Sequence, residues 1–236
     1  MSDKKLPQDF ARPLRTIKSF VLRSGRMTEA QTRAMDEHQQ RYGLRVADGV
    51  LDQQKTFSRT APLVLEIGFG MGQSLVAQAQ RFPDWDFIGI EVHRPGIGKL
   101  FQMTDELQLP NIRAYNHDAV EVLEKCIADN SLDRVQIFFP DPWHKKKHHK
   151  RRLIQPAFVQ QLRKKLKPGG IIHVATDWHH YAEHIMEVME LAEGFNNQSG
   201  EYAFAEKPDS RPLTKFEQRG KNLGHGVWDI LFVKDA

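Results

Sequence analysis

Residues 137–152 read IFFPDPWHKKKHHKRR and combine three kinds of side chain that chemistry on a nucleic-acid base would use. The apolar run 137–139 is typical of the end of a buried strand, and open α/β sheets bind their ligands at such strand ends. Asp141 and Trp143 follow in a Pro-Asp-Pro-Trp turn, which puts a carboxylate and an aromatic ring at the mouth of the predicted site. The next eight residues, 145–152, hold six Lys or Arg and two His, which can bind phosphates. The segment therefore predicts a carboxylate that does chemistry beside a nucleic-acid-binding surface.

A run of charge also has a simpler interpretation, which is a solvated loop without a ligand. The strand and turn that lead directly into this run favour a binding site instead. Ten of the 34 Lys and Arg residues lie between Asp141 and Pro168, and a second basic block without acids lies between Phe10 and Thr28. Because the net charge is only +4, this clustering predicts a localised footprint for phosphates.

The segment EIGFGMG, residues 66–72, connects a predicted strand to a predicted helix. Gly68, Gly70 and Gly72 allow backbone conformations that other residues avoid, and they let a ligand approach the chain closely. A dinucleotide-binding fingerprint would have its third glycine at position 73, where this chain has Gln73. The loop therefore predicts a ligand site and gives a nicotinamide cofactor little support.

Two further acids follow predicted strands. Glu91 ends the second strand, where an acid typically binds ribose hydroxyls, and Asp118 follows the third, where a side chain can meet an adenine edge. Taken singly, each acid has the simpler interpretation of a helix cap or a solvated carboxylate. Together with Asp141 and the glycine loop, they predict a nucleoside-containing cofactor at the carboxyl edge of one sheet.

The elements that must position these residues alternate between strand and helix from Pro62 onward. The pattern predicts strands over 63–67, 86–92, 111–116, 133–139, 169–176 and 227–233. It predicts helices over 71–82, 96–107, 119–127, 156–166 and 181–192. We expect an α/β, Rossmann-like fold with a mostly parallel sheet, helices on both faces and an antiparallel C-terminal strand. The predicted organisation is a flexible basic arm over 1–30, a short helix and loop cover over 31–60, and the main domain over 61–236.

Composition limits the class of protein. The chain has 236 residues and a mean hydropathy of −0.56, and it lacks an apolar run of about 18 residues that could cross a membrane. Its N-terminus has no apolar stretch typical of a signal peptide. The single cysteine, Cys126, cannot form an internal disulfide, and we expect it to be a small buried side chain. These features predict a cytoplasmic protein.

The motifs together resemble the S-adenosylmethionine-dependent methyltransferases, and more narrowly the bacterial tRNA (guanine-N7)-methyltransferase family. The blocks that carry the resemblance lie between Leu65 and Phe232. They are LEIGFGMG, GIEVH, NHDAVEVL, FFPDPWHKKKHHKRR, ATDW, SRPLTKFEQRG and GHGVWDILF. The resemblance implies transfer of a methyl group from S-adenosylmethionine to N7 of guanosine 46 in the tRNA variable loop.

The resemblance and the motifs also give a set of expected site residues. The cofactor contacts expected are Glu66, Gly68, Gly70, Glu91, Asp118 and Asp141. The substrate contacts expected are Lys145, Asp177, Thr214, Lys215, Phe216 and Glu217. The RNA contacts expected are Lys147, His148, His149, Lys150, Arg151 and Arg152. We expect tRNA as the partner, no obligate protein partner, and a monomer.

The chemistry of guanine N7 limits what the enzyme must supply. N7 already has a lone pair, so no proton must leave before it attacks a sulfonium methyl group, and catalysis should rest on alignment and electrostatics. We expect Asp141 to stabilise the positive charge that grows on the ring. Asp177 and Glu217 can accept the N1–H and N2–H donors of guanine. Trp143 or Phe216 can stack on the base, although Phe216 is equally compatible with a core position.

Other interpretations stay open at this stage. An exocyclic-amine methyltransferase carries an Asn/Asp-Pro-Pro-aromatic turn, which PDPW only partly matches. A non-catalytic RNA-binding protein on the same fold is disfavoured by the glycine loop and the three acids. His144, His148 and His149 lie close together, but zinc sites normally add cysteines or an acid at set spacing, so no metal is predicted. His173, inside a strand, is predicted to be a satisfied core side chain.

Overall fold

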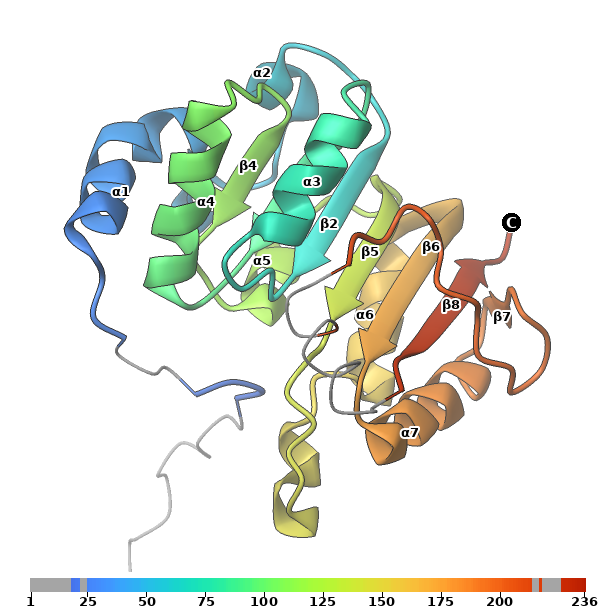
Figure 1. The fold of residues 1–236 in the computed structure, drawn as a ribbon. Coiled ribbons are helices and arrows are strands. Elements are labelled where there is room, and N and C mark those ends of the chain that lie inside the picture. Colours follow the sequence, from blue (N-terminus) through green and yellow to red (C-terminus); the bar gives the residue numbers. More distant parts are fainter. Residues whose placement is uncertain (1–17, 22–24, 214–216, 218–225) are drawn as a thin grey trace, which may run out of the picture.

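The computed structural model describes residues 18–21, 25–213, 217 and 226–236. Over these residues the chain forms an eight-stranded sheet in the order β1-β4-β3-β2-β5-β6-β8-β7 (Figure 1). Its strands are β1 (Gly43–Leu44), β2 (Leu63–Ile67), β3 (Asp86–Ile90), β4 (Ile112–Tyr115), β5 (Leu132–Phe138), β6 (Leu166–Thr176), β7 (Phe195–Asn197) and β8 (Trp228–Lys234). The pairs from β1 to β6 are parallel, and β8 pairs antiparallel with β6 and β7. The predicted α/β fold with an antiparallel C-terminal strand is confirmed.

Helices cover both faces of the sheet. They are α1 (Glu29–Tyr42), α2 (Gln53–Phe57), α3 (Gln73–Arg81), α4 (Arg94–Glu106), α5 (Ala119–Lys125), α6 (Pro156–Lys165) and α7 (His179–Glu190), with 3-10 turns η1 (Val46–Asp48) and η2 (Lys146–Arg151). One core cluster joins α1, α3 and α4 to one face, and the other joins α5, α6 and α7 to the opposite face. Each of the predicted helices and strands has a counterpart in the structure.

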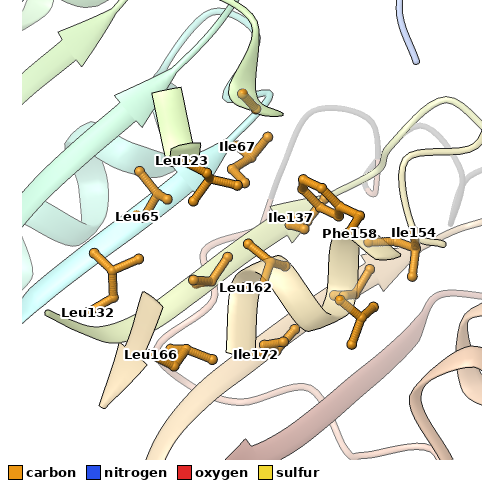
Figure 2. Packing of buried hydrophobic residues seen from close by; sticks show 14 of the residues in the cluster. Leu65, Ile67, Leu123, Leu132, Ile137, Ile154, Phe158, Leu162, Leu166 and Ile172 are labelled. Atoms are coloured by element: carbon orange, nitrogen blue, oxygen red, sulfur yellow. The ribbon is translucent and has the colours of Figure 1, made fainter. Parts of the chain in front are cut away.

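The strand β2 shows why the central strands are apolar throughout. All of its residues are buried, as expected for a parallel strand covered on both faces. Val64 packs in the α3–α4 cluster, whereas Leu65 and Ile67 belong to the other cluster. Figure 2 shows this second cluster, where Phe158 and Leu162 of α6 lie over β5 and β6. Truncating a fully buried leucine such as Leu65 to alanine should cost about 2–5 kcal/mol of unfolding free energy.

The N-terminal region contributes to this architecture. Helix α1 begins at Glu29, within the segment predicted as an arm, because Thr28 and Gln31 form a reciprocal capping box. The helix packs against α4, and the two residues of β1 pair with β4 at the edge of the sheet. Neither β1 nor β7 was predicted, because strands this short are specified by pairing with a neighbour and not by a local pattern.

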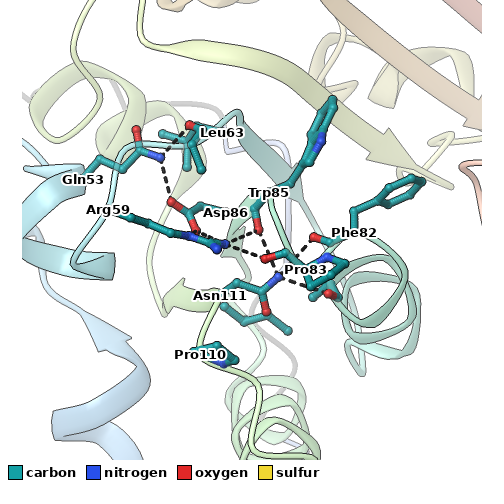
Figure 3. A network of polar contacts seen from close by, with 12 residues as sticks. Gln53, Arg59, Leu63, Phe82, Pro83, Trp85, Asp86, Pro110 and Asn111 are labelled. Carbon is teal, nitrogen blue, oxygen red and sulfur yellow. Dashed lines mark hydrogen bonds and ion pairs between the residues drawn. The ribbon is translucent and has the colours of Figure 1, made fainter.

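A polar network fixes the amino end of the sheet (Figure 3). Asp86, the first residue of β3, is fully buried and accepts hydrogen bonds from Gln53 Nε2 at 2.8 Å and Arg59 Nε at 2.9 Å. Asn111 donates to backbone carbonyls that include that of Trp85. These contacts lie at the end of β3 opposite Glu91, so they hold the strands without taking part in the ligand site.

Candidate active site

A pocket of about 210 Å³ opens at the carboxyl ends of β2, β3, β4 and β5. Its wall includes three of the predicted acids and one predicted glycine, contributed by four different strand ends. The lining residues are Ser19, Phe20, Val21, Ile67, Gly68, Ile90, Glu91, Val92, His117, Asp118, Ala119, Ile137, Phe138, Pro140, Asp141 and Leu153. The parallel sheet therefore brings together side chains that are far apart in the sequence, as the strand-end pattern predicted.

The glycine loop begins at Gly68, which lines this pocket. Gly68 and Gly70 have φ angles of 77° and 60°, which glycine adopts without strain. A Cβ atom at Gly68 or Gly70 would meet no atom within 4 Å, so the space beside the backbone is open. The Gly70 N–H donates to Glu91 Oε2 at 2.9 Å, which ties the loop to the next strand.

Glu91 lies just beyond β3 and is 9% exposed. Its Oε1 atom accepts the N–H groups of Val92 at 2.7 Å and His93 at 2.9 Å, and its Oε2 atom accepts from Gly70. These backbone donors fix the carboxylate at the pocket wall. A carboxylate has about four lone-pair directions, so three N–H donors leave it capacity to accept from a ligand hydroxyl.

Asp118 is both a helix cap and a pocket residue. Its Oδ1 atom accepts the Val120 N–H at 3.1 Å at the start of α5, which is the simpler interpretation given above. Its Oδ2 atom lies 3.4 Å from Lys18 Nζ, so the acid also contacts the chain segment that covers the pocket. The two roles are compatible because capping uses only one carboxylate oxygen.

Glu66 differs from the other predicted cofactor residues, because it is not among the residues that line the pocket. It is 2% exposed and faces α3, where Gln78 Nε2 donates to it at 3.4 Å. Gln136 in turn donates to Gln78 at 2.8 Å, which extends the buried chain of polar groups to β5. Burial raises the pKa of Glu66 to about 8. The network joins β2 to the helix that follows the glycine loop.

The turn after β5 has an unusual backbone. Phe139 and Trp143 have φ angles of 53° and 49°, values that are uncommon for residues other than glycine. This conformation brings Asp141 to the rim of the pocket, where its side chain is exposed. The Trp143 N–H points at Asp141 Oδ1 at 3.4 Å. Strained backbone of this kind is typical of functional sites.

The basic segment after this turn forms η2, a 3-10 element that was not predicted. Lys145, Lys147 and Lys150 are exposed, and His148 and His149 are half-buried. Arg152 differs from the others, since it is 5% exposed, donates to the Pro142 carbonyl at 3.0 Å and stacks over the Tyr181 ring. Its guanidinium is buried as an anchor for the turn, in contrast to the surface position expected of a phosphate contact.

A segment near the N-terminus covers the pocket. Ser19, Phe20 and Val21 line it, and Trp143 Nε1 donates to the Ser19 carbonyl at 3.2 Å. Arg151 donates to the carbonyls of Lys18 at 3.2 Å and Phe20 at 3.0 Å, and its guanidinium carbon lies 4.0 Å from the centroid of the Trp143 ring. Residues 18–21 thus join the pocket to the basic segment. The sequence indicated only that this region is basic.

Apart from Lys145, the predicted substrate residues follow β6 in the sequence. Asp177 follows Thr176, and its neighbour Trp178 contacts the His144 ring with centroids 4.3 Å apart. This ring contact brings the segment of Asp177 beside that of Lys145. Glu217 is 1% exposed and accepts from Arg211 Nη1 at 2.6 Å. Thr214, Lys215 and Phe216 lie outside the described residues.

The histidine and cysteine residues outside the pocket include two buried side chains and one exposed cluster. His173 is buried and contacts Asp229 Oδ1 at 2.7 Å, so its predicted core position is confirmed. Cys126 is buried, as predicted. Within the described part of the chain, His179, His180 and Glu183 form the one group of His, Cys, Asp or Glu whose ligand atoms lie close enough to share a metal ion, and all three are exposed.

Comparison with known proteins decides the family. Residues 60–230 match a family described as "Putative methyltransferase". A tRNA (guanine-N(7)-)-methyltransferase of Alcanivorax borkumensis is 59% identical over 223 residues, covering 94% of this chain and 93% of the relative. An enzyme of the same name from Saccharophagus degradans is 58% identical over 93% of this chain and 96% of the relative. The chain belongs to the tRNA (guanine-N(7)-)-methyltransferase family. The predicted family and enzyme class are confirmed, and the protein is an S-adenosylmethionine-dependent methyltransferase.

Solved structures confirm the fold of this methyltransferase. The 16S rRNA methyltransferase KamB matches with a TM-score of 0.58 and 14% identity, over 79% of this chain and 95% of that chain. A 16S rRNA (adenine(1408)-N(1))-methyltransferase from Catenulisporales acidiphilia matches with a TM-score of 0.53 and 14% identity, over 82% of this chain and 92% of that chain. No helix in the described ranges is long and apolar enough to cross a membrane.

Proposed function

We propose that this methyltransferase transfers the methyl group of S-adenosylmethionine to N7 of a guanine in tRNA, with guanosine 46 of the variable loop as its target. The observation that carries the proposal is the position of Asp141, at the rim of the strand-end pocket and directly before the basic segment. A reacting base held at this rim has the pocket on one side and phosphate-binding side chains on the other. We also propose that the protein works as a monomer in the cytoplasm.

The pocket residues fit a nucleoside cofactor with a charged tail. The open space beside Gly68 leaves room for a ligand against the backbone. Glu91 is fixed by backbone N–H groups and can accept a ribose hydroxyl, while Asp118 stands at the next strand end, where an adenine edge would lie. When bound, S-adenosylmethionine supplies an electrophilic methyl group on a sulfonium sulfur. Glu66 accepts a hydrogen bond from Gln78 in α3, the helix that follows the glycine loop. We therefore propose that Glu66 positions the loop without contacting the cofactor.

The reaction needs alignment more than proton transfer. Guanine N7 attacks with its own lone pair, so the protein must hold N7 in line with the methyl group and exclude water. As the N7–methyl bond forms, the methyl–sulfur bond breaks, its electron pair stays on sulfur, and S-adenosylhomocysteine is the leaving group. Methylation leaves the imidazole part of the base positively charged. Asp141 can stabilise this charge as it develops, since its carboxylate is oriented by the Trp143 N–H before the base arrives.

Recognition of guanine requires acceptors for its N1–H and N2–H donors. Asp177 and Glu217 are the proposed acceptors, and adenine lacks the donors in this arrangement. Lys145 follows His144, which contacts Trp178 next to Asp177, and we propose Lys145 as a further substrate contact. Trp143 remains our candidate for stacking, although in this structure Arg151 lies over one face of its ring. Thr214, Lys215 and Phe216 are proposed to complete the substrate site.

The basic segment is proposed to bind the tRNA backbone. Lys147, His148, His149 and Lys150 are proposed as phosphate contacts, together with Arg151. We assign Arg152 a supporting role, because its guanidinium holds the Pro142 carbonyl and lies over Tyr181.

A direct test is methyl transfer from labelled S-adenosylmethionine to bulk tRNA, followed by borohydride and aniline treatment. The reagents cleave RNA at N7-methylguanosine, so we expect strand scission at one position in the variable loop. Nuclease digestion with mass spectrometry distinguishes N7 from N2 or N6 methylation. Labelled tRNA that resists cleavage and yields an exocyclic-amine product would contradict the proposal.

A further inference from the structure

The carboxylate of Glu217 is held by a buried arginine that no part of the proposed reaction uses. Arg211 is 1% exposed, and its Nη1 atom donates to Glu217 Oε2 at 2.6 Å. The other two guanidinium nitrogens donate to Asp229, with Nε to Oδ1 at 2.7 Å and Nη2 to Oδ2 at 2.9 Å. Arg211 is therefore held at both sides, and its plane fixes where the Glu217 carboxylate lies.

The support of Arg211 comes from the sheet. Asp229 lies in β8 and is 2% exposed, and its Oδ1 atom also contacts His173 Nε2 in β6 at 2.7 Å. Burial lowers the pKa of His173, so the imidazole is neutral and acts as a hydrogen-bond donor. Burial alone would raise the pKa of Asp229, but hydrogen bonds from His173 and Arg211 lower it overall, so the carboxylate is ionised. The chain His173–Asp229–Arg211–Glu217 thus begins in the rigid sheet.

The same chain reaches the cofactor pocket. The His173 ring meets the Phe138 ring edge-on, with centroids 4.9 Å apart. Phe138 lines the pocket. The contacts that hold Glu217 and the pocket residue Phe138 therefore come from the same strands, β5, β6 and β8.

The described segment that leads to Arg211 is held at several points. After β7 the chain returns over the sheet (Figure 1), where Ala205 pairs with Asp229 and Arg134 of β5 donates to Ser210 Oγ at 3.2 Å. The Arg211 N–H closes a turn onto the Pro208 carbonyl at 2.9 Å. Arg211 is thus placed accurately by its backbone as well as by its side chain.

Stability alone does not account for this arrangement. Taking a guanidinium and two carboxylates out of water costs solvation free energy that their mutual attraction only partly offsets, and apolar residues of the same volume often replace such groups without loss. A buried charge chain that includes a proposed ligand residue is better explained by the geometry that it imposes.

We propose that Arg211 is a positioning residue for guanine recognition, which orients Glu217 toward the base and is itself oriented by Asp229 and His173. The inference rests on the proposed function, because it takes Glu217 as a guanine acceptor. It extends that function by three residues, none of which need touch the substrate.

The test uses full-length protein and synthetic tRNA in which the target guanosine is replaced by inosine, which lacks the N2 amine, or by 2-aminopurine, which lacks the N1–H. Both analogues keep N7. We expect the parent to prefer guanosine over at least one analogue by about 10- to 100-fold in kcat/KM, the value of one hydrogen bond to a charged group. Glu217→Gln should remove the preference for guanosine over one of the two analogues. That analogue then reports on the contact between Glu217 and the base.

Arg211→Lys keeps the positive charge but cannot donate to Glu217 and Asp229 from the two sides of one planar group. We expect the kcat/KM for guanosine tRNA to exceed that for the same analogue tRNA by no more than about threefold, while the affinity for the cofactor is unchanged. Arg59→Lys is the matched control, since Arg59 also binds a buried aspartate, Asp86, at the opposite end of the sheet (Figure 3). It should change thermal stability and leave the preference intact. If Arg211→Lys does not fold, Asp229→Asn is measured under the same criterion.

Two failures are distinguishable. If the parent methylates guanosine but Glu217→Gln changes neither preference, the recognition role of Glu217 is wrong, and the positioning role of Arg211 is overturned with it. If Glu217→Gln removes a preference that Arg211→Lys retains, only the positioning role is overturned.

Discussion

At the scale of single residues, the carboxylates around the pocket have different tasks because their environments differ. Glu91 is fixed by three backbone N–H groups, Asp118 shares its oxygens between a helix cap and Lys18, and Asp141 lies exposed at the rim. The first two can bind a cofactor in place before any RNA arrives. Asp141 is the one whose charge would face the reacting base.

Asp141→Asn should keep the fold and cofactor binding and lose most of the methyl transfer. The amide has the same size and retains one acceptor oxygen, but it lacks the negative charge proposed to stabilise the cationic product ring. Losing one preorganised electrostatic contact of this kind typically costs on the order of 10²–10³ in rate. Single-turnover rates at saturating tRNA and cofactor measure the effect, with Asp177→Asn as the comparison. A near-parental rate for Asp141→Asn would leave the turn with only a scaffold role.

Glu91→Ala should weaken S-adenosylmethionine binding by about 10- to 100-fold, because the proposed carboxylate acceptor for a ligand hydroxyl is removed. Isothermal titration without RNA gives the affinity. Glu124→Ala, which removes an exposed acid from α5, is the control and should have no effect. Equal affinities for the parent and a folded Glu91→Ala protein would exclude the ribose contact.

At the scale of secondary-structure elements, the strands and α-helices from β2 onward, apart from β7, follow from patterning alone. The buried apolar run of β2 and the 3.6-residue spacing on α7 predicted both elements within a few residues of their observed bounds. The 3-10 turn η2 escaped prediction because six cations in eight residues carry no hydrophobic period. Burial of Arg152 also escaped prediction, since its partners, the Pro142 carbonyl and Tyr181, come together only in the folded chain.

The buried polar network between β2 and α3 should make stability depend on pH. Burial raises the pKa of Glu66 from 4.5 to about 8, so the folded protein holds a proton that the unfolded chain releases above about pH 4.5. This contribution to stability is complete below pH 4.5 and is lost as the pH rises toward 8. Glu66→Gln should flatten the decline in unfolding free energy between pH 5 and pH 8 by on the order of 1–3 kcal/mol. Urea unfolding at several pH values measures it, and identical slopes in both proteins would show that Glu66 stays ionised.

The basic element η2 should dominate the salt dependence of tRNA binding. Replacing Lys146, Lys147 and Lys150 by alanine should reduce the slope of log K against log salt by roughly 2–3 units, if each meets a phosphate. The control replaces three exposed lysines elsewhere, Lys55, Lys164 and Lys207. Filter binding across a salt series gives both slopes. An unchanged slope in the η2 variant would make the segment a solvated loop.

At the scale of the whole molecule, the pocket lies at the carboxyl ends of the parallel strands, and the polar network around Asp86 lies at their amino ends. The strand order brings Gly68, Glu91, Asp118 and Asp141 to a single pocket, and sequence reasoning predicted this because parallel strand ends share an edge. It did not predict that residues 18–21 would line that pocket, or that Glu217 would be tied to Asp229 through Arg211. Both depend on contacts between distant segments, for which no local pattern exists.

The central claim, methyl transfer to guanine N7, is tested most directly by changing one atom of the substrate. Two tRNAs are compared, one with guanosine and one with 7-deazaguanosine at position 46, where a C–H group replaces N7. We predict stoichiometric transfer of labelled methyl to the first tRNA and none to the second, with similar affinity for both. Methylation of the 7-deaza tRNA at a comparable rate would contradict the account and assign the methyl group to another atom.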